Sequence, residues 1–165
     1  VSWGADELDP HIKKYEDERT DQFNGNLANE WYSGKNFIVL RYADVLLCYA
    51  ECLNELGETG QANTIVNQVR ARAWGGTLPN EMAWNYGQDE FRTQIMNERI
   101  RELCFEGWRR MDLIRTGKFV ELIKERNSWA KKSGTIKDFH MRYPIPDTEI
   151  KNNDDISEED QNPGY

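Results

Sequence analysis

Three glutamates, Glu98, Glu102 and Glu106, recur at every fourth position of one predicted helix. Residues four apart lie on the same face of a helix, so the three carboxylates should form a row. Pairs of carboxylates are the catalytic groups of glycoside hydrolases, which makes hydrolysis of a sugar polymer one activity to consider. That chemistry requires carboxylates on opposite sides of the scissile bond in an open cleft. A row along one helix face does not supply this arrangement.

The row of glutamates needs cations close to it. Like charges at this spacing repel mildly, and partial burial makes an unpaired carboxylate far more costly. Arginine suits such a site because its planar guanidinium satisfies both carboxylate oxygens, and further candidates are Arg72, Arg110 and Arg115. We therefore predict a structural ion-pair network, in preference to catalysis, made of Arg41, Glu51, Arg70, Glu98, Arg99, Glu102, Glu106, Arg109 and Asp112.

Aromatic side chains are abundant, with six Trp, seven Tyr and six Phe among 165 residues. Several stand beside Gly, Asn or Ser in predicted loops or at helix ends, where flat rings can stack on the C–H faces of sugars. The alternative is that they cap the ends of the helical core. Our candidate ligand-binding residues are Trp31, Tyr32, Trp74, Trp84, Tyr86 and Trp129. On this hypothesis Trp84→Ala weakens glycan binding without unfolding the domain.

Other reactive residue types show no catalytic or metal-binding pattern. His11 and His140 are isolated, and Gly75-Gly76 neither follows a strand nor opens a phosphate-binding loop. The cysteines, Cys48, Cys52 and Cys104, lie in apolar helical patterns without CxxC spacing, so we expect buried thiols and no metal or cofactor. The net charge of −8 and the lack of a basic stripe argue against nucleic-acid binding.

The apolar periodicity predicts an all-α fold, without a convincing strand. A helix of about five turns ends at Gly57, and a second one runs to Trp74. Residues at the spacing of a tetratricopeptide (TPR) unit predict that these two helices form a TPR-like hairpin in which small alanines allow close packing. These residues are Leu46, Tyr49, Ala50, Leu53, Ala62 and Val66.

The rest of the chain reads as shorter helices, long loops and a tail. A loop over residues 74–88 precedes a third helix over residues 89–106, which we expect to be buried on several sides. A short helical segment over 108–115 and a fourth helix over 119–126 follow. The tail is expected to be extended and non-helical, because Pro144 and Pro146 disfavour helix at the residues before them.

Five segments, read in order, resemble the SusD/RagB family. Residues 40–51 (LRYADVLLCYAE) are similar to one family helix, and residues 67–72 (NQVRAR) to the next. Residues 98–117 resemble the family pattern that runs from ER through FEG to DLIRTG. The segments YPIPDTEI and QNPGY, at 143–150 and 161–165, resemble the end of the family sequence. The resemblance covers residues 37–165, a C-terminal helical domain, and residues 1–36 form an irregular N-terminal segment.

This resemblance implies an outward-facing lipoprotein of a bacterial outer membrane, built on a TPR-like scaffold. It would bind a glycan and deliver it to a SusC-like TonB-dependent transporter, without acting as an enzyme. The alternatives are a peptide-capturing RagB-like member and, more remotely, a TPR-type protein-interaction module. No apolar stretch approaches the roughly 20 residues of a membrane span, and the sequence starts at Val1 without an initiating Met. We expect the export signal, the lipid anchor and an N-terminal partner domain to lie upstream.

Overall fold

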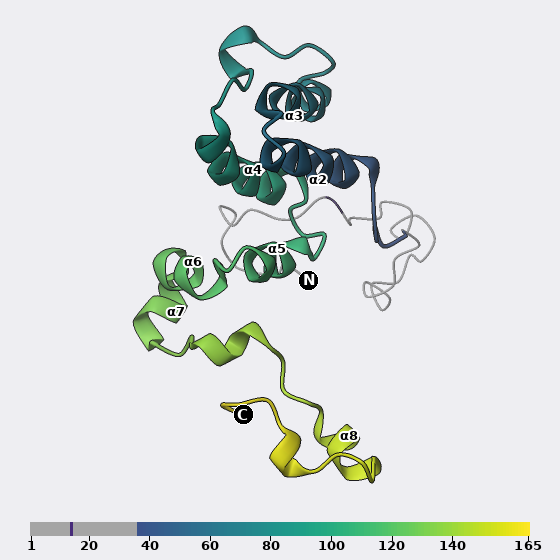
Figure 1. Ribbon diagram of the computed structural model, residues 1–165, viewed down its shortest axis with the longest axis vertical. Helices are drawn as coiled ribbons and strands as arrows, with labels where there is room; N and C mark the ends of the chain where they lie inside the picture. The colour runs from purple at the N-terminus through teal and green to yellow at the C-terminus, as the bar shows by residue number, and fades with distance from the viewer. Residues whose placement is uncertain (1–13, 15–35) are drawn as a thin grey trace, which may run out of the picture. The chain divides into compact units, whose positions relative to one another are not determined.

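The computed structural model describes Lys14 and residues 36–165, and it groups Leu40–Tyr165 in one structural unit (Figure 1). The predictions made for Trp31, Tyr32 and a short helix near His11 lie outside the described residues. Every regular element in the described part is helical, which confirms the all-α class. None of its helices is long and apolar enough to cross a membrane.

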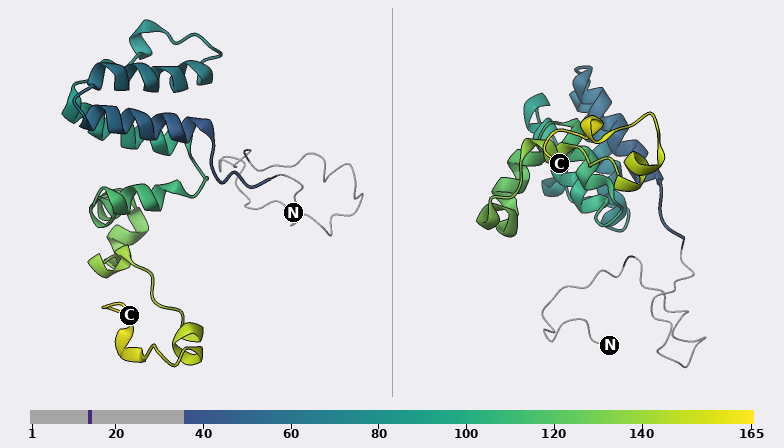
Figure 2. Two further views of the ribbon diagram at one scale, coloured as in Figure 1. Left: turned by 45° about the vertical axis from the view of Figure 1, so that its right-hand side comes forward. Right: turned by 90° about the horizontal axis from the view of Figure 1, so that it is seen from below.

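Helices α2 (Tyr42–Glu55) and α3 (Thr59–Ala73) form the predicted hairpin, joined by a tight turn (Figures 1 and 2). Gly57 makes this turn with a φ of 86°, a left-handed conformation that is costly for residues with a Cβ atom. Ala50 and Ala62 are completely buried where the helices meet, and so is Val66. Small side chains at these positions let the helix backbones approach closely, so the TPR-like hairpin is confirmed.

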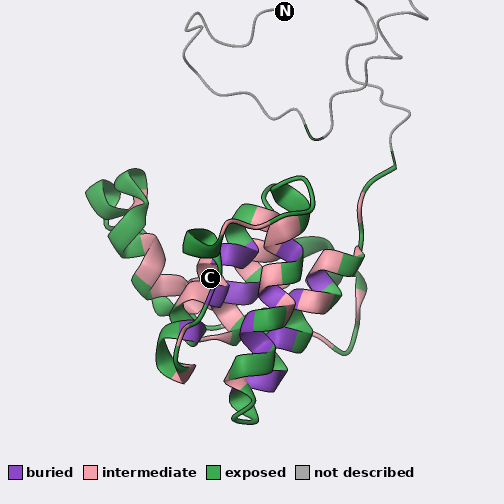
Figure 3. Cartoon of the chain, turned by 90° about the horizontal axis from the view of Figure 1, so that it is seen from above, coloured by how far each residue is buried: buried purple, intermediate pink, exposed green. Residues whose placement is uncertain are grey.

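Helix α4 (Gln88–Glu102) packs on α2 and completes the core of the unit. Phe91 and Ile95 from α4 join Leu47 and Leu53 from α2 in a single apolar cluster. Figure 3 shows the buried positions gathered on the faces that the packed helices turn toward one another. Helix α4 contacts α2, α3 and α5, as expected of a helix packed on several sides, but its last turn is partly open, because Ile100 is 39% exposed and Arg101 is also exposed.

Helix α4 ends about one turn earlier than the periodicity predicts. Residues 103–107 form an irregular turn in which Phe105 has a φ of 62° and Gly107 a φ of 86°. Two left-handed residues so close together cannot continue a right-handed helix, although the apolar pattern runs on to Phe105. The short helices α5 (Trp108–Arg115), α6 (Phe119–Arg126) and α7 (Ser128–Ser133) follow.

The C-terminal tail is partly helical, which corrects the prediction that it is extended throughout. Residues 143–146 are extended, as their prolines require. The 3-10 turns η3 (Asp138–Met141) and η4 (Glu158–Asp160) flank a short helix, α8 (Asp147–Asn152), which begins directly after Pro146. Pro146 has a φ of −58° and no N–H group, so it can directly precede a helix although it cannot continue one.

Candidate functional site

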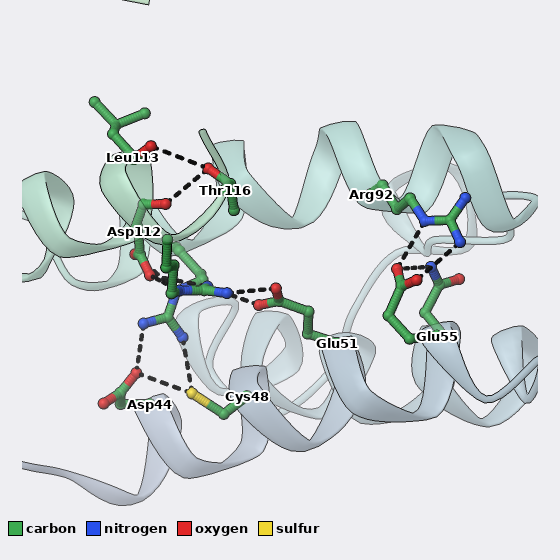
Figure 4. A network of polar contacts seen from close by, with 11 residues as sticks. Asp44, Cys48, Glu51, Glu55, Arg92, Asp112, Leu113 and Thr116 are labelled. Atoms are coloured by element: carbon green, nitrogen blue, oxygen red, sulfur yellow. Dashed lines mark hydrogen bonds and ion pairs between the residues drawn. The ribbon is translucent and has the colours of Figure 1, made fainter. Parts of the chain in front are cut away.

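A buried guanidinium, that of Arg99 on α4, is only 2% exposed and pairs with Asp44 on α2 and Asp112 on α5. Figure 4 shows these two carboxylates in the network. The Nη2 atom of Arg99 lies 2.8 Å from an oxygen of Asp44, and its Nε donates to Asp112 at 2.8 Å. Arg115 extends the chain of ion pairs, with Nη2 2.9 Å from Asp112 and 2.7 Å from Glu51. The carboxylates of two helices are thus held together by two arginines.

The pKa values follow this geometry. Burial by itself would lower the pKa of Arg99, but the bonds to Asp112 and the nearby charge of Asp44 outweigh it and raise the pKa. The hydrogen bonds to Glu51 raise the pKa of Arg115 even further above its ordinary value. Both arginines stay charged at any pH that the protein meets, so they provide a fixed electrostatic link between the helices.

The row of glutamates is engaged in the same way. Arg41 binds Glu106, with Nε 2.8 Å from the carboxylate, and also binds Glu102. Glu102 receives a second guanidinium from Arg72 at 2.6 Å. Glu106 is buried and Glu102 half-buried, so both are shielded from bulk water as well as neutralised.

The third glutamate of the row, Glu98, is buried and binds Arg70 at 2.8 Å and Arg101 at 3.3 Å. All three carboxylates therefore accept from arginines that belong to the fold. A glycosidase needs two carboxyl groups on opposite sides of an open cleft, whereas each of these three carboxyl groups contacts at least one guanidinium group of the scaffold. This arrangement can hold helices together, and it offers no open pair of carboxylates to a substrate.

Two arginines are placed differently from the others. Arg109 has no carboxylate within ion-pair distance among the described residues, and its Nη1 donates to the carbonyl of Met96 at 3.1 Å. It was predicted as a member of the ion-pair network, and this position corrects that prediction.

Burial lowers the pKa of Arg109. Its side chain borders a groove of about 520 Å³, which Leu122 also lines. Arg110 lies between the rings of Phe119 and Tyr143, 4.7 and 4.1 Å from their centroids.

Among the acids, Asp44 was not predicted as a partner in the network. The signal was present, because Asp44 lies three residues before Leu47 on the apolar face of its helix. An acid on a buried face requires a cation opposite it. The sequence does not say which arginine that is, since the choice depends on how α4 packs against α2.

The loop with the predicted aromatic residues is fastened to α3 by a ladder of side-chain amides. Asn67 donates to the carbonyl of Trp84 at 3.0 Å and accepts from its N–H at 2.7 Å. Asn63 makes the same pair of bonds to Tyr86, at 2.9 and 3.1 Å. Arg70 donates to the carbonyl of Met82 at 3.1 Å. Side chains about one turn apart on α3 therefore form hydrogen bonds with the backbone of every second loop residue, namely Met82, Trp84 and Tyr86.

These hydrogen bonds hold the loop so that the ring of Trp84 packs into the core. The prediction that Trp84 contacts a ligand is therefore corrected. Trp84 is only 6% exposed, and its ring lies 5.6 Å from Phe91 and 5.1 Å from Tyr86. Tyr86 is half-buried against the same cluster. Both residues thus follow the alternative considered from the sequence, in which loop aromatics cap the helical core.

Two predicted aromatic residues do lie at the surface of the described unit. Trp129 on α7 is 80% exposed, and Trp74, the residue after α3, is 51% exposed beside Gly75. A residue with a φ of 73° such as Gly75 turns the chain sharply, which leaves the preceding ring uncovered. Trp31 and Tyr32 lie outside the described residues. No group of His, Cys, Asp or Glu side chains within the described part could hold a metal ion.

The cysteines also differ from the prediction of buried thiols. Cys48, Cys52 and Cys104 are all exposed in the described unit. The Sγ atom of Cys48 lies 3.3 Å from Nη1 of Arg99, and burial of the thiol raises its pKa despite this positive neighbour. Cys52 lies on a face of α2 that no described residue covers, whereas Cys48 lies at the edge of the helix beside Arg99.

Comparison with known proteins gives consistent matches. The chain is 38% identical over 133 residues to SusD-like protein P25 of Formosa agariphila, a match that covers 79% of this chain and 25% of the relative. SusD-like protein P2 of the same organism is 34% identical over 160 residues, or 94% of this chain and 30% of the relative. Starch-binding protein SusD of Bacteroides thetaiotaomicron is 28% identical over 159 residues, or 93% and 26%.

The chain thus spans about a quarter to a third of the length of these curated relatives. No solved structure matches it. The family model described as the SusD family matches residues 1–165, which include every motif and every ion pair described above. The chain belongs to the SusD family.

Proposed function

We propose that this protein binds glycans at the outer surface of a bacterial outer membrane, as a lipoprotein, and delivers them to a SusC-like TonB-dependent transporter. The observation that carries the proposal is the family match over the whole chain. It is supported by the similarity to a relative named as a starch-binding protein. The fold agrees with a binding role, because the carboxylates of Glu98, Glu102 and Glu106 are paired with arginines of the scaffold.

The described unit offers Trp129 and Trp74 as ligand contacts. Both are large exposed rings, and a ring that faces water can stack on the flat C–H face of a sugar without unpacking the core. Trp31 and Tyr32 stay in the proposal as residues outside the described part. Trp84 and Tyr86 are left out of it, because their rings pack within the unit.

A peptide ligand is the second candidate, since exposed tryptophans also suit the apolar side chains of an extended peptide. Isothermal titration calorimetry of the full-length polypeptide against a panel of glycans and a panel of peptides separates the two. Binding to a glycan supports the proposal. Peptide binding without any glycan binding would replace it with capture of peptides. Release of new reducing ends from a bound polysaccharide would show an enzyme instead.

Trp129→Ala tests the contact predicted within this chain. We expect the glycan affinity to fall about fivefold or more, because truncation of a tryptophan that anchors a ligand costs more than about 1 kcal/mol. The thermal midpoint should stay at the wild-type value, since the ring touches little of the core. The matched control is Trp84→Ala, which removes a buried ring and should cost about 3–5 kcal/mol of unfolding free energy. Unchanged affinity in Trp129→Ala would remove this residue from the site.

A further inference from the structure

The outer face of α2 carries a second apolar stripe, separate from the face that packs on α3 and α4. It consists of Tyr42, Val45, Tyr49, Cys52 and Leu56. These residues follow one another at intervals of three, four, three and four. With about 3.6 residues per turn, this spacing keeps them all in one narrow row along the helix. The same interval defines the contact face of two packed helices, so we call this row the α2 seam.

The α2 seam is uncovered in the described unit. Tyr42 is 74% exposed and Leu56 is 78% exposed. Val45, Tyr49 and Cys52 are also exposed to water. An isolated exposed apolar side chain is ordinary on a protein surface. Five in an unbroken row, on a helix whose opposite face is already buried, are typical of a helix packed on two sides.

The charges of α2 avoid the α2 seam. Asp44 and Glu51 point toward α4 and α5, where they bind Arg99 and Arg115. Glu55 is turned to the side and binds Arg92 of α4 at 2.7 Å. Every acidic residue of α2 is therefore used on the far side or the flank of the helix. The α2 seam itself contains no charged side chain, so another helix can pack against it without removing a charge from water.

The occupant is best supplied by the same polypeptide. The curated relatives are three to four times longer than the part that this chain matches, so most of their length lies outside it. We propose that the α2 seam packs against an amphipathic helix of the same polypeptide from outside residues 36–165, with its own apolar residues at intervals of three and four. This proposal concerns assembly of the scaffold and does not depend on which ligand the protein binds.

The native thiol of Cys52 reports whether the seam is covered. The full-length polypeptide, carrying Cys48→Ser, is treated with N-ethylmaleimide under native conditions and in urea, and modified peptides are measured by mass spectrometry. We expect Cys52 to react about tenfold or more slowly in the native protein, a ratio that needs an opening free energy of only about 1.4 kcal/mol. A cysteine introduced by Gln68→Cys, on the exposed polar side of α3, should react at similar rates in both conditions.

A cross-linking experiment identifies the occupant. Tyr49 is replaced by p-benzoylphenylalanine in the full-length polypeptide, which is then irradiated and digested. We expect the cross-link to join residue 49 to a peptide outside residues 36–165 of the same molecule, without a band of doubled mass. A cross-link to a second copy would overturn the proposal in favour of a dimer. Cys52 reacting as fast in the native protein as in urea would also overturn it, because the seam would then be open to water.

Discussion

At the scale of single residues, the core of this protein depends on one buried cation. Arg99 is 2% exposed and lies between the carboxylates of Asp44 and Asp112, so each of the three charges is stable only because the others are present. Replacement of both partners by apolar residues can be neutral, whereas removal of one leaves a charge buried without compensation. The arrangement therefore fixes how α2, α4 and α5 meet more than it adds net stability.

Arg99→Met tests this reading. We expect the free energy of unfolding to fall by about 3–5 kcal/mol, because the buried carboxylate of Asp44 loses its cation and Asp112 keeps only Arg115. Urea unfolding followed by circular dichroism measures the change. Arg92→Met is the matched control, since Arg92 binds Glu55 at the surface, and its midpoint should stay at the wild-type value. Equal effects of the two substitutions would show that burial does not decide the strength of these pairs.

The sequence identified the members of the ion-pair network better than their partners. Three glutamates on one helix face and a set of arginines require pairing on electrostatic grounds alone. Arg109 satisfies the same pattern and yet binds the carbonyl of Met96, and Arg110 is held between two aromatic rings. A guanidinium group bonds equally well to carboxylates, carbonyls or ring faces, so only the packing of the helices selects among them.

At the scale of elements, the amide ladder on α3 explains how a long loop becomes part of the core. Asn63 and Asn67 each satisfy the N–H and the carbonyl of one loop residue, as a neighbouring strand would do. The loop backbone needs such partners because Trp84 draws it against the apolar cluster. A surface loop is thereby converted into a fixed layer between α3 and α4.

Asn67→Ala should detach this layer. It leaves the N–H and the carbonyl of Trp84 without partners, and each unsatisfied buried group costs about 1–3 kcal/mol. We expect a lower midpoint of urea unfolding and a red shift of the tryptophan fluorescence as the ring of Trp84 meets water. Gln68→Ala, at the next and exposed position of α3, should change neither measurement. A wild-type emission spectrum in Asn67→Ala would mean that apolar packing alone holds the loop.

At the scale of the whole described unit, the C-terminal segment is attached by a small aromatic cluster. Tyr165 lies edge-on to the ring of Phe139, 5.0 Å away, and its hydroxyl donates to the carbonyl of Arg142 at 2.9 Å. Gln161 both donates to and accepts from the backbone of Ile145. Gly164 has a φ of 101°, and a Cβ atom at this position would overlap the ring of Phe139. The family-like ending thus closes back on the extended segment at residues 143–146.

Gly164→Ala should open this closure. The left-handed conformation and the overlap with Phe139 both disfavour alanine, and such backbone strain costs about 1–3 kcal/mol. We expect faster tryptic cleavage after Arg142 and Lys151, while the far-ultraviolet circular dichroism stays close to wild type. Gly87→Ala is the control, because Gly87 has a φ of −73° and open space around it. Unchanged cleavage in Gly164→Ala would show that the last residues do not hold the tail.

The sequence by itself determined the all-α class, the α2–α3 hairpin, the extended prolines and most residues of the ion-pair network, Asp44 and Arg109 excepted, because periodicity, turn residues and charge spacing are local properties. It did not determine the partner of each arginine, the inward turn of Trp84, the early end of α4 or the exposure of the cysteines. The row Glu98, Glu102 and Glu106 shows the reason. The spacing of these glutamates can be read from the sequence, but most of the arginines that pair with them lie 28 to 65 positions away, and one, Arg101, lies on the same helix. Only the tertiary structure brings such distant groups together, and so only it decides whether a carboxylate is a structural ion or a catalytic acid.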